Sequence, residues 1–427
     1  MRTIVFFLCL TVNGAVYSQD YGDFPKINKE KLLRDLELLQ QGLDQYHTGM
    51  YWYTSKTDVE IAFKEARSKI TKDLNVLAFH KIIAPLIALS NEDHTNIFLP
   101  EVVKEQIAKQ AKFLPITIVF LGRELYLVKD GSGTSENLEG QKILSINGEF
   151  PQQIVSKIGS LFASDGYIEQ VKFSDLEGFE FSKYYYYFYG NIPQYEIEFE
   201  SKILTFQSLD ISTIRKNLSS KYKRSTLENK ESLEFKVIED SIAYMAFHTF
   251  SNSSIKENKK SNSLKSFLES SFQTIHETNI KTLIIDVSKN GGGSEGNENL
   301  VYSYLGENYQ KYLKVKANRQ SVVLDNGIDE PIKLKTFGFF ERAFGNKKMK
   351  DGSYERKENI GFGLKAYKKE PKYKFDGKLY VLISPVTYSG GSELCNMLHT
   401  NDLATFIGQE TGGGYYGNTS GYSQELT

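Results

Sequence analysis

The stretch Leu379–Leu398, LYVLISPVTYSGGSELCNML, decides the fold of this chain. It begins as an apolar run typical of a buried strand, breaks at Pro385, and resumes as a helical pattern after Ser389 and two glycines. A similar step occurs upstream, where the apolar run KTLII at 281–285 leads into the loop DVSKNGGG. Both stretches predict a strand, a loop and a helix, with Ser389 in one of the loops.

The residues before KTLII extend this pattern into a sheet. An apolar strand pattern, SIAYMAF at 241–247, is followed by an amphipathic helix pattern at 263–279. A helix between two apolar strands predicts a βαβ unit with parallel strands. Because parallel strands end at the same edge of a sheet, the glycine loop and the Ser389 turn are expected to meet there.

Glycines near the start of a helix leave backbone N–H groups free for a phosphate or for the oxyanion of an acyl-transfer intermediate. No lysine follows NGGG as a phosphate-binding loop requires, so phosphate is the weaker alternative.

In the rest of the chain, the predicted secondary structure changes from helices to strands. Leucine spacings from 28 to about 90 predict helices, and short alternating runs from 113 predict strands. The tyrosine-rich segment FEFSKYYYYFYGN at 179–191 predicts a half-buried strand pair, because aromatic residues favour strands. The polar run 212–234 predicts a solvated linker, and 314–374 reads as a long insertion.

Composition and the N-terminus limit the functional classes. Lys+Arg 52 against Asp+Glu 53 gives no charge excess for nucleic acid or another polyanion. The apolar run Thr3–Val12 after a basic residue predicts a secretory signal cleaved after Ser18, since it is too short to span a bilayer. We therefore expect an exported protein that is periplasmic, on the cell surface or secreted. Of its two cysteines only Cys395 would remain, so no internal disulfide is expected.

A catalytic serine needs a base within hydrogen-bond reach, usually histidine or lysine. His80 and His276 lie within helical patterns, and His399 lies on the helix that leads away from Ser389. His47 and His248 lie near element ends and stay as outside candidates. His94 differs because it stands in a loop, SNEDHTNIF, between a helix and the next strand.

These segments together resemble the tail-specific or C-terminal processing serine peptidase superfamily. The resemblance rests on KTLIIDVSKNGGG, LYVLISPVTYSGGSE and IGQETGGG, in that order, with the family's histidine loop matched by NEDHTNIFLP. LEGQKILSINGEFPQQIV is similar to part of a PDZ-like module. The resemblance implies an α/β fold with a ClpP/crotonase-like ββα catalytic core, an N-terminal helical domain and a PDZ-like β-rich region.

Carried over by position, the resemblance makes Ser389 the nucleophile. It assigns the oxyanion hole to the backbone N–H of Gly390 with one from Gly292 or Gly293. Processing-protease members take their base from a lysine in the turn that corresponds to IGQETGGG. In this sequence that turn reads GQETGGGYYGN and contains no lysine. The resemblance therefore favours the tricorn-like branch, whose base is a histidine from an N-terminal loop, and assigns that role to His94.

The residue that orients this histidine stays open. In the tricorn-like branch it lies well beyond the serine, whereas this sequence continues for only 427 − 389 = 38 residues after Ser389. We therefore expect the orienting group to be missing or to be replaced by Glu410, Asp93 or Glu393. The expected domains are a signal peptide (1–18), a helical domain with the His94 loop (19–100), a PDZ-like region (101–211), a linker (212–235) and a catalytic core (236–427). The core is expected to be incomplete at its C-terminus.

The expected function is hydrolysis of peptide bonds in unfolded or C-terminal polypeptide segments, without a metal or cofactor. Two alternatives remain: a non-catalytic protein that binds a peptide or apolar ligand on the same scaffold, and an acyl hydrolase of small esters. The sequence does not indicate the oligomeric state.

Overall fold

The computed structural model describes residues 21–222, 231–239, 241–257, 263–307, 314, 316–317, 345–357 and 370–414. The expected signal peptide lies outside these residues. The chain forms two compact units, each built from separate stretches. Unit 1 comprises Met1–Phe24, Pro100–Ile158 and Leu176–Lys223; unit 2 comprises Pro25–Leu99, Gly159–Asp175 and Arg224–Thr427.

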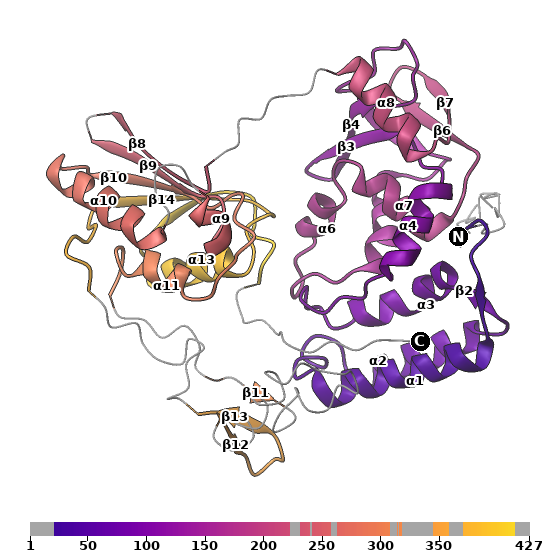
Figure 1. The fold of residues 1–427 in the computed structure, drawn as a ribbon, viewed down its shortest axis with the longest axis horizontal. Helices are drawn as coiled ribbons and strands as arrows, with labels where there is room; N and C mark the ends of the chain where they lie inside the picture. The colour runs from indigo at the N-terminus through magenta and orange to yellow at the C-terminus, as the bar shows by residue number, and fades with distance from the viewer. Residues whose placement is uncertain are drawn as a thin grey trace, which may run out of the picture. The chain divides into compact units, whose positions relative to one another are not determined.

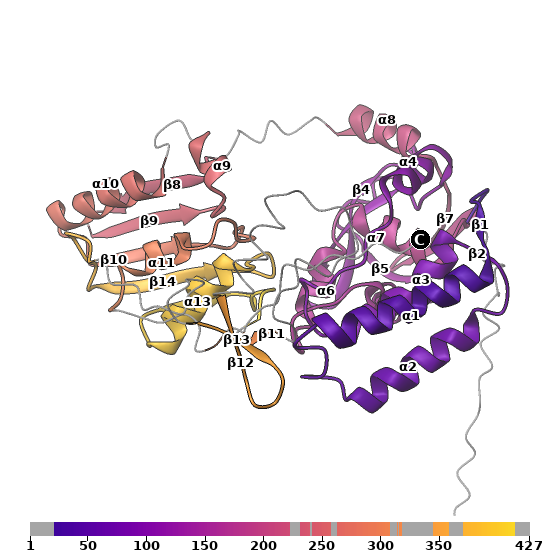
Figure 2. The same cartoon turned by 60° about the horizontal axis from the view of Figure 1, so that its bottom comes forward.

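Unit 2 contains the sheet that the sequence predicts. Its described strands are β8 (Leu233–Glu239), β9 (Ile242–Phe247), β10 (Thr282–Asp286), β14 (Lys378–Ile383) and β15 (Thr405–Gly408). They lie in the order β15-β14-β10-β9-β8, and Figures 1 and 2 label β8, β9, β10 and β14 within this sheet. All neighbours are parallel except β8 and β9. The predicted parallel βαβ unit is therefore confirmed.

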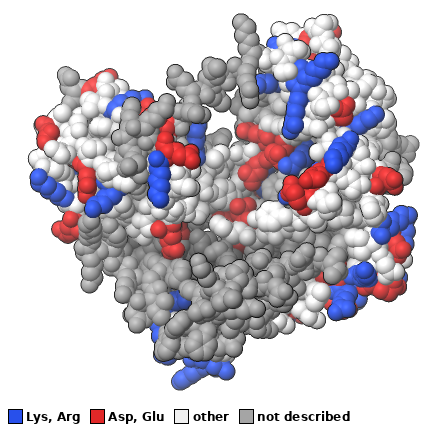
Figure 3. All heavy atoms as spheres, in the orientation of Figure 1, with Lys and Arg blue, Asp and Glu red and all other residues white. Residues whose placement is uncertain are grey.

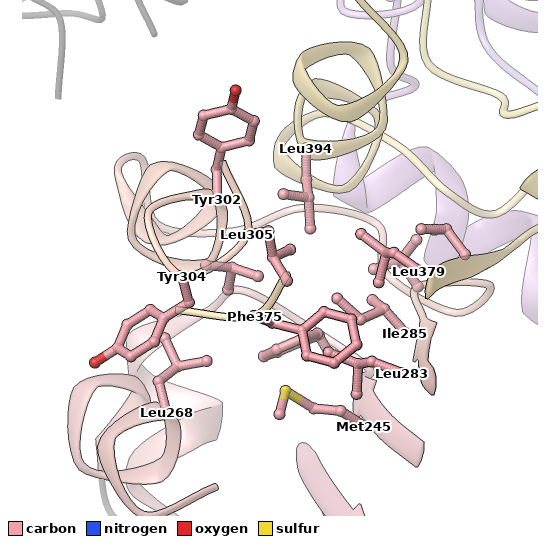
Figure 4. Close-up of a cluster of buried hydrophobic side chains, with 14 of the residues drawn as sticks. Met245, Leu268, Leu283, Ile285, Tyr302, Tyr304, Leu305, Phe375, Leu379 and Leu394 are labelled. Carbon is pink, nitrogen blue, oxygen red and sulfur yellow. The ribbon is translucent and has the colours of Figure 1, made fainter. Parts of the chain in front are cut away.

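Helices pack against this sheet and close its core. They are α9 (Asn252–Lys256), α10 (Leu264–Glu277), α11 (Asn297–Tyr302) and α13 (Gly390–Thr400), with α11 in contact with both α10 and α13. Figure 4 shows side chains from the strands meeting side chains from the helices, and the labelled strand residues Met245, Leu283 and Ile285 are fully buried. This packing gives the edge of the sheet a rigid support.

The N-terminal part of unit 2 is helical, as predicted. It consists of β1 (Lys26–Ile27), α1 (Lys29–Tyr46), α2 (Lys56–Lys69), β2 (Leu74–Asn75) and α3 (Val76–Ala88). The side chains of Asn28, Ser55 and Asn75 cap the three helices by accepting a backbone N–H. The helices share an apolar cluster that includes Leu32 and Ile83. The segment with η1 (Gly159–Leu161) and α6 (Gln170–Asp175) joins this unit, and η1 packs on α3.

Unit 1 contains the predicted β-rich region. An antiparallel sheet runs in the order β3-β4-β5-β6-β7, formed by Ile116–Leu121, Glu124–Asp130, Lys142–Ile146, Gln194–Phe199 and Ile203–Gln207. Its described helices are α4 (Glu101–Gln110), α5 (Pro151–Ile158), α7 (Glu180–Tyr189) and α8 (Ile211–Lys221). The insertion belongs to unit 2, where Lys316–Ala317, Asn346–Lys348 and Tyr354–Arg356 form a small antiparallel sheet of β11, β12 and β13.

Two predictions of local structure were wrong. The tyrosine-rich segment is not a strand pair but helix α7, which buries Phe181 and Tyr185, four residues apart, and ends at Gly190 with φ 79°. The first part of the polar run is not a linker but helix α8. The Asp210 side chain caps α8 by accepting the N–H of Thr213.

Acidic and basic side chains are both scattered over the described part of the face in Figure 3. This distribution agrees with the near-balance of charge in the sequence. Among the described helices, none combines the length and apolar character needed to cross a bilayer.

Candidate active site

The Ser389 turn and the glycine loop meet at the predicted edge of the sheet. Strands β10 and β14 are parallel neighbours, so the loops that follow them start side by side. The Thr387 hydroxyl donates to the Val287 carbonyl at 2.9 Å, and the Tyr388 N–H donates to the Asn290 carbonyl at 2.9 Å. These bonds fix the backbone of one loop against the other.

Ser389 has an unusual backbone conformation, with φ 47° and ψ −122°. A positive φ in a residue other than glycine is uncommon, and such strain clusters at functional sites. Ser389 stands directly before the first residue of α13, and its side chain forms no capping hydrogen bond. Its hydroxyl has no hydrogen-bond partner among the described residues and is therefore available for chemistry.

Gly292 lies directly against Ser389. A Cβ atom on Gly292 would stand 2.6 Å from the Ser389 Cβ and 3.0 Å from its Oγ, and Gly292 has φ 98°. Only glycine meets both requirements, because any side chain would displace the serine. The glycine loop is therefore shaped around the Ser389 side chain.

The predicted oxyanion donors differ in how their N–H groups are used. The Gly292 N–H donates to the Asn290 side-chain oxygen at 2.9 Å. By contrast, the N–H groups of Gly390 and Gly293 have no partner in the described part of the chain. Gly390 also begins α13, where the helix dipole favours negative charge. Of the two alternatives left by the sequence, Gly293 thus has the N–H that is not engaged.

A third loop, which follows β15 and contains residues 409–414, packs on the Ser389 turn. The Gly413 N–H donates to the Thr387 carbonyl at 3.1 Å. A Cβ atom on Gly412 would stand 2.2 Å from the Tyr388 ring and 2.2 Å from the Pro385 carbonyl oxygen. The run of glycines in GQETGGG therefore serves close packing on the turn.

His94 occupies the loop that follows α3. Its side chain is partly exposed, and its Nδ1 lies 3.1 Å from the Glu92 Oε1. The hydrogen bond to the Glu92 carboxylate raises the pKa of His94 above its ordinary value, against the effect of burial. Glu92 is itself buried, and its other oxygen accepts the Thr95 hydroxyl at 2.7 Å. With Nδ1 engaged in this way, Nε2 is the nitrogen that can accept a proton.

Sequence reasoning named Glu410, Asp93 and Glu393 as orienting groups, whereas the structure brings Glu92 to His94. Glu410 is exposed, and Glu393 lies in the first turn of α13. The motif contained the signal for Glu92, because a carboxylate two residues before a loop histidine can reach its ring. No role was predicted for Glu92 from the sequence.

Asp93 links the His94 loop to the neighbourhood of Ser389. Burial, followed by the charge of Asp165, raises the pKa of Asp93 to about 6. Burial and the nearby carboxylates of Asp93, Asp175 and Asp165 raise the pKa of Tyr388. The Tyr388 hydroxyl is buried and forms no well-aligned hydrogen bond to a described residue. The neighbours of the two predicted catalytic residues therefore lie within electrostatic reach of each other.

The other histidines have different surroundings. His47 lies behind the His94 loop, where its Nε2 is 2.8 Å from the Thr95 hydroxyl and burial lowers its pKa. His80 is buried in α3, where burial lowers its pKa to about 4. His276 and His399 lie on α10 and α13, and His248 directly follows β9. His94 differs from His47 and His80 because its ring is partly exposed and forms a hydrogen bond with a carboxylate.

One group of side chains near His94 has the composition of a metal site. Atoms of Glu92, His94 and Asp165 lie within 4.8 Å of one another. The carboxylates already accept hydrogen bonds from Thr95, Asp93 and Gly414. These bonds account for the carboxylates without an ion, so we assign no metal to the site.

Among the described residues, a strained serine with an unpartnered hydroxyl lies beside free backbone N–H groups, which is the arrangement that a serine hydrolase site on an α/β sheet requires. Comparison with known proteins agrees with this class, because residues 241–421 match peptidase family S41. The match supports a serine-type peptidase of the S41 superfamily of tail-specific proteases, and the mixed α/β fold of the chain is similar to that of S41 proteases.

Solved structures of CPAF share this fold. Mature CPAF is 15% identical, with a TM-score of 0.54 over 90% of this chain and 84% of that chain. A CPAF mutant is 15% identical, with a TM-score of 0.58 over 90% of this chain and 84% of that chain. CPAF complexed with lactacystin is 14% identical, with a TM-score of 0.55 over 90% of this chain and 85% of that chain. A comparison with the curated proteins finds no match.

Proposed function

We propose that this chain cleaves peptide bonds with Ser389 as nucleophile and His94 as general base. One observation carries the proposal: the Ser389 hydroxyl is unpartnered within the described chain and stands next to the free N–H of Gly390 at the start of α13. This is the geometry that acyl transfer requires, since the attacking oxygen and an oxyanion donor must face the same carbonyl group.

The reaction follows from these positions. His94 Nε2 takes the proton of the Ser389 hydroxyl while Oγ attacks the peptide carbonyl carbon, and the carbonyl oxygen becomes an oxyanion. That oxygen accepts hydrogen bonds from the N–H groups of Gly390 and Gly293. The protonated His94 then gives its proton to the leaving amine, and water hydrolyses the acyl-enzyme by the same route.

Glu92 has a defined part in this reaction. Its hydrogen bond to Nδ1 holds the imidazole in the tautomer that leaves Nε2 as the acceptor. Its negative charge also stabilises the imidazolium that forms when His94 takes the proton. We assign it the orienting role for which the sequence offered Asp93 and Glu410.

We further propose that the substrates are unfolded or C-terminal segments of polypeptides. An extended segment can add as a strand to an edge of the β3-β4-β5-β6-β7 sheet, in the way that PDZ-like modules bind chain ends.

The first residues support export through a signal peptide. Intact mass measurement of the protein from its native host is expected to find Gln19 as the first residue.

The direct test is hydrolysis of a denatured protein by the wild type and by Ser389→Ala. We expect Ser389→Ala to lower the rate by about 10³-fold or more, because only oxyanion stabilisation and binding remain. Circular dichroism should show an unchanged fold. Equal rates for the two proteins would remove the proposal.

The same variants separate the peptidase from a binding protein on this scaffold. A fluorophosphonate reacts only with an activated serine, so the wild type is expected to become labelled and Ser389→Ala is not. A folded wild-type protein that binds peptide but does not become labelled would favour the binding function.

A further inference from the structure

The His94 loop is bonded to a distant segment of unit 2. The Asp93 N–H donates to the Asp165 Oδ1 at 2.8 Å. At the next position the bonds are reciprocal: the Gly166 N–H donates to the Asn91 carbonyl at 2.8 Å, and the Asn91 side-chain amide donates to the Gly166 carbonyl at 2.7 Å. Three hydrogen bonds thus hold the residues around His94 to positions 165 and 166.

The same Asp165 carboxylate also reaches the loop that packs on the Ser389 turn. Its Oδ2 accepts the N–H of Gly414 at 2.7 Å, across 249 residues of sequence. Gly414 directly follows Gly413, whose N–H is bonded to the Thr387 carbonyl two residues before Ser389. One carboxylate therefore joins the loop of the proposed base to the loop that supports the nucleophile.

The geometry of this bridge allows little movement. Asp165 is 6% exposed. Because so little water reaches its carboxylate, losing one of the hydrogen bonds that it accepts would be energetically costly. A Cβ atom on Gly414 would stand 3.1 Å from the Asp165 Cβ, which shows how closely the two backbones approach. The Asp165 segment is itself anchored, because η1 packs on α3 and Lys172 donates to the Gly159 carbonyl at 3.0 Å.

We propose that Asp165 is the positioning residue that fastens the His94 loop to the Ser389 side of the active site. This inference rests on the proposed function, since it assumes that His94 acts on Ser389. Asp165 has no contact with the substrate in this account. It acts through the backbone N–H groups of Asp93 and Gly414, and its loss separates base from nucleophile.

The electrostatic surroundings agree with this role. The Asp165 carboxylate contributes to the raised pKa of His94, so it lies close enough to stabilise the imidazolium. Two backbone N–H donors on one carboxylate are charge-assisted hydrogen bonds, about twice as strong as neutral ones. A neutral side chain at position 165 would weaken both.

The test compares Asp165→Ala, Asp165→Asn and Asp175→Asn. Asp175 is a matched control: it lies at the end of α6, burial raises its pKa to about 7, and its side chain forms no hydrogen bond with a described residue. We expect Asp165→Ala to lower kcat about 10²-fold with KM nearly unchanged, because a displacement of about 1 Å at the reacting groups has an effect of this size. Asp165→Asn keeps one acceptor oxygen and should fall between Asp165→Ala and the wild type, while Asp175→Asn should match the wild type.

Each result has a definite meaning when kcat is expressed per folded molecule. An unchanged kcat in Asp165→Ala, or an equal loss in Asp165→Asn and Asp175→Asn, would overturn the positioning role and leave only a structural one. If Asp165→Ala does not fold, the isosteric Asp165→Asn carries the test alone, with a loss of about tenfold expected. Ser389→Ala is measured beside them. Full activity in that variant would contradict the proposed function itself, whatever the Asp165 variants do.

Discussion

The Ser389 turn and the His94 loop carry the two halves of the proposed chemistry, and they are held in opposite ways. The Ser389 turn is bonded to the loop of the neighbouring parallel strand, within one continuous sheet. The His94 loop depends on Asn91 and Asp93, which are bonded to a segment more than 70 residues downstream. The nucleophile is thus fixed by its own sheet, whereas the base is fixed by residues from elsewhere in the chain.

This difference predicts how the two regions respond to mutation. Damage to the Ser389 turn should affect the shape of the nucleophile and the oxyanion donors directly. Damage to the His94 loop should leave the nucleophile intact and remove only proton transfer. The following variants test this division, beginning with the largest expected effect.

His94→Ala is expected to lower kcat by about 10²- to 10⁴-fold, because it removes the general base and leaves the oxyanion donors in place. The measurement is the initial rate of hydrolysis of a denatured protein. His399→Ala is the control, since His399 is exposed on α13. A full rate in His94→Ala would mean that the base lies elsewhere.

Gly292→Ala is expected to lower kcat about 10²-fold, because its new Cβ would meet the Ser389 Cβ and move the nucleophile. Gly291→Ala is a matched control in the same loop, where a new Cβ meets no atom within 4 Å. Similar kinetics for the two variants would contradict the close fit between the glycine loop and Ser389.

Glu92→Gln should lower kcat about tenfold and also change its pH dependence. His94 must be neutral to accept a proton, so activity falls as pH falls through its pKa. The Glu92 carboxylate raises this pKa, and its removal should move the acid limb of the profile to lower pH. The profile of kcat/KM against pH checks this, with Glu101→Gln on the exposed surface of α4 as control. An acid limb that does not move would separate Glu92 from His94.

Leu283→Ala should have the smallest effect on activity, although it removes a fully buried side chain of β10. The expected loss is about 2–5 kcal/mol in the free energy of unfolding, measured by urea denaturation, with kcat per folded molecule unchanged. Ile407→Ala, at a position 51% exposed in β15, should cost less than about 0.5 kcal/mol. Equal losses would argue against the core as the support of the Ser389 turn.

The sequence predicted the core sheet well because its signals are local. Apolar runs of strand length, a helix pattern between them and glycines at the strand ends are sufficient to predict parallel strands and adjacent loops. The same local reasoning failed for α7. Strand preference of the aromatic residues was given more weight than the four-residue spacing of Phe181 and Tyr185, which the helix buries. It also missed the cap at Asp210 that begins α8.

Prediction of the site was limited by sequence distance. Ser389 and the glycine loop could be paired because both follow strands of one sheet. His94 was assigned from a resemblance, and its role remains a prediction. Asp165 has no motif of its own, and its significance comes from backbone N–H groups 72 and 249 residues away. No pattern in a single sequence specifies such a pairing.

The measurement that tests the central claim most directly is the rate at which a fluorophosphonate labels Ser389 in the wild type and in His94→Ala. It reports activation of the serine itself, without substrate binding or product release. If His94 is the base, labelling of His94→Ala should be slower by about 10²-fold or more although Ser389 and its turn are intact. Labelling at the wild-type rate would contradict the account, because Ser389 would then be activated without His94.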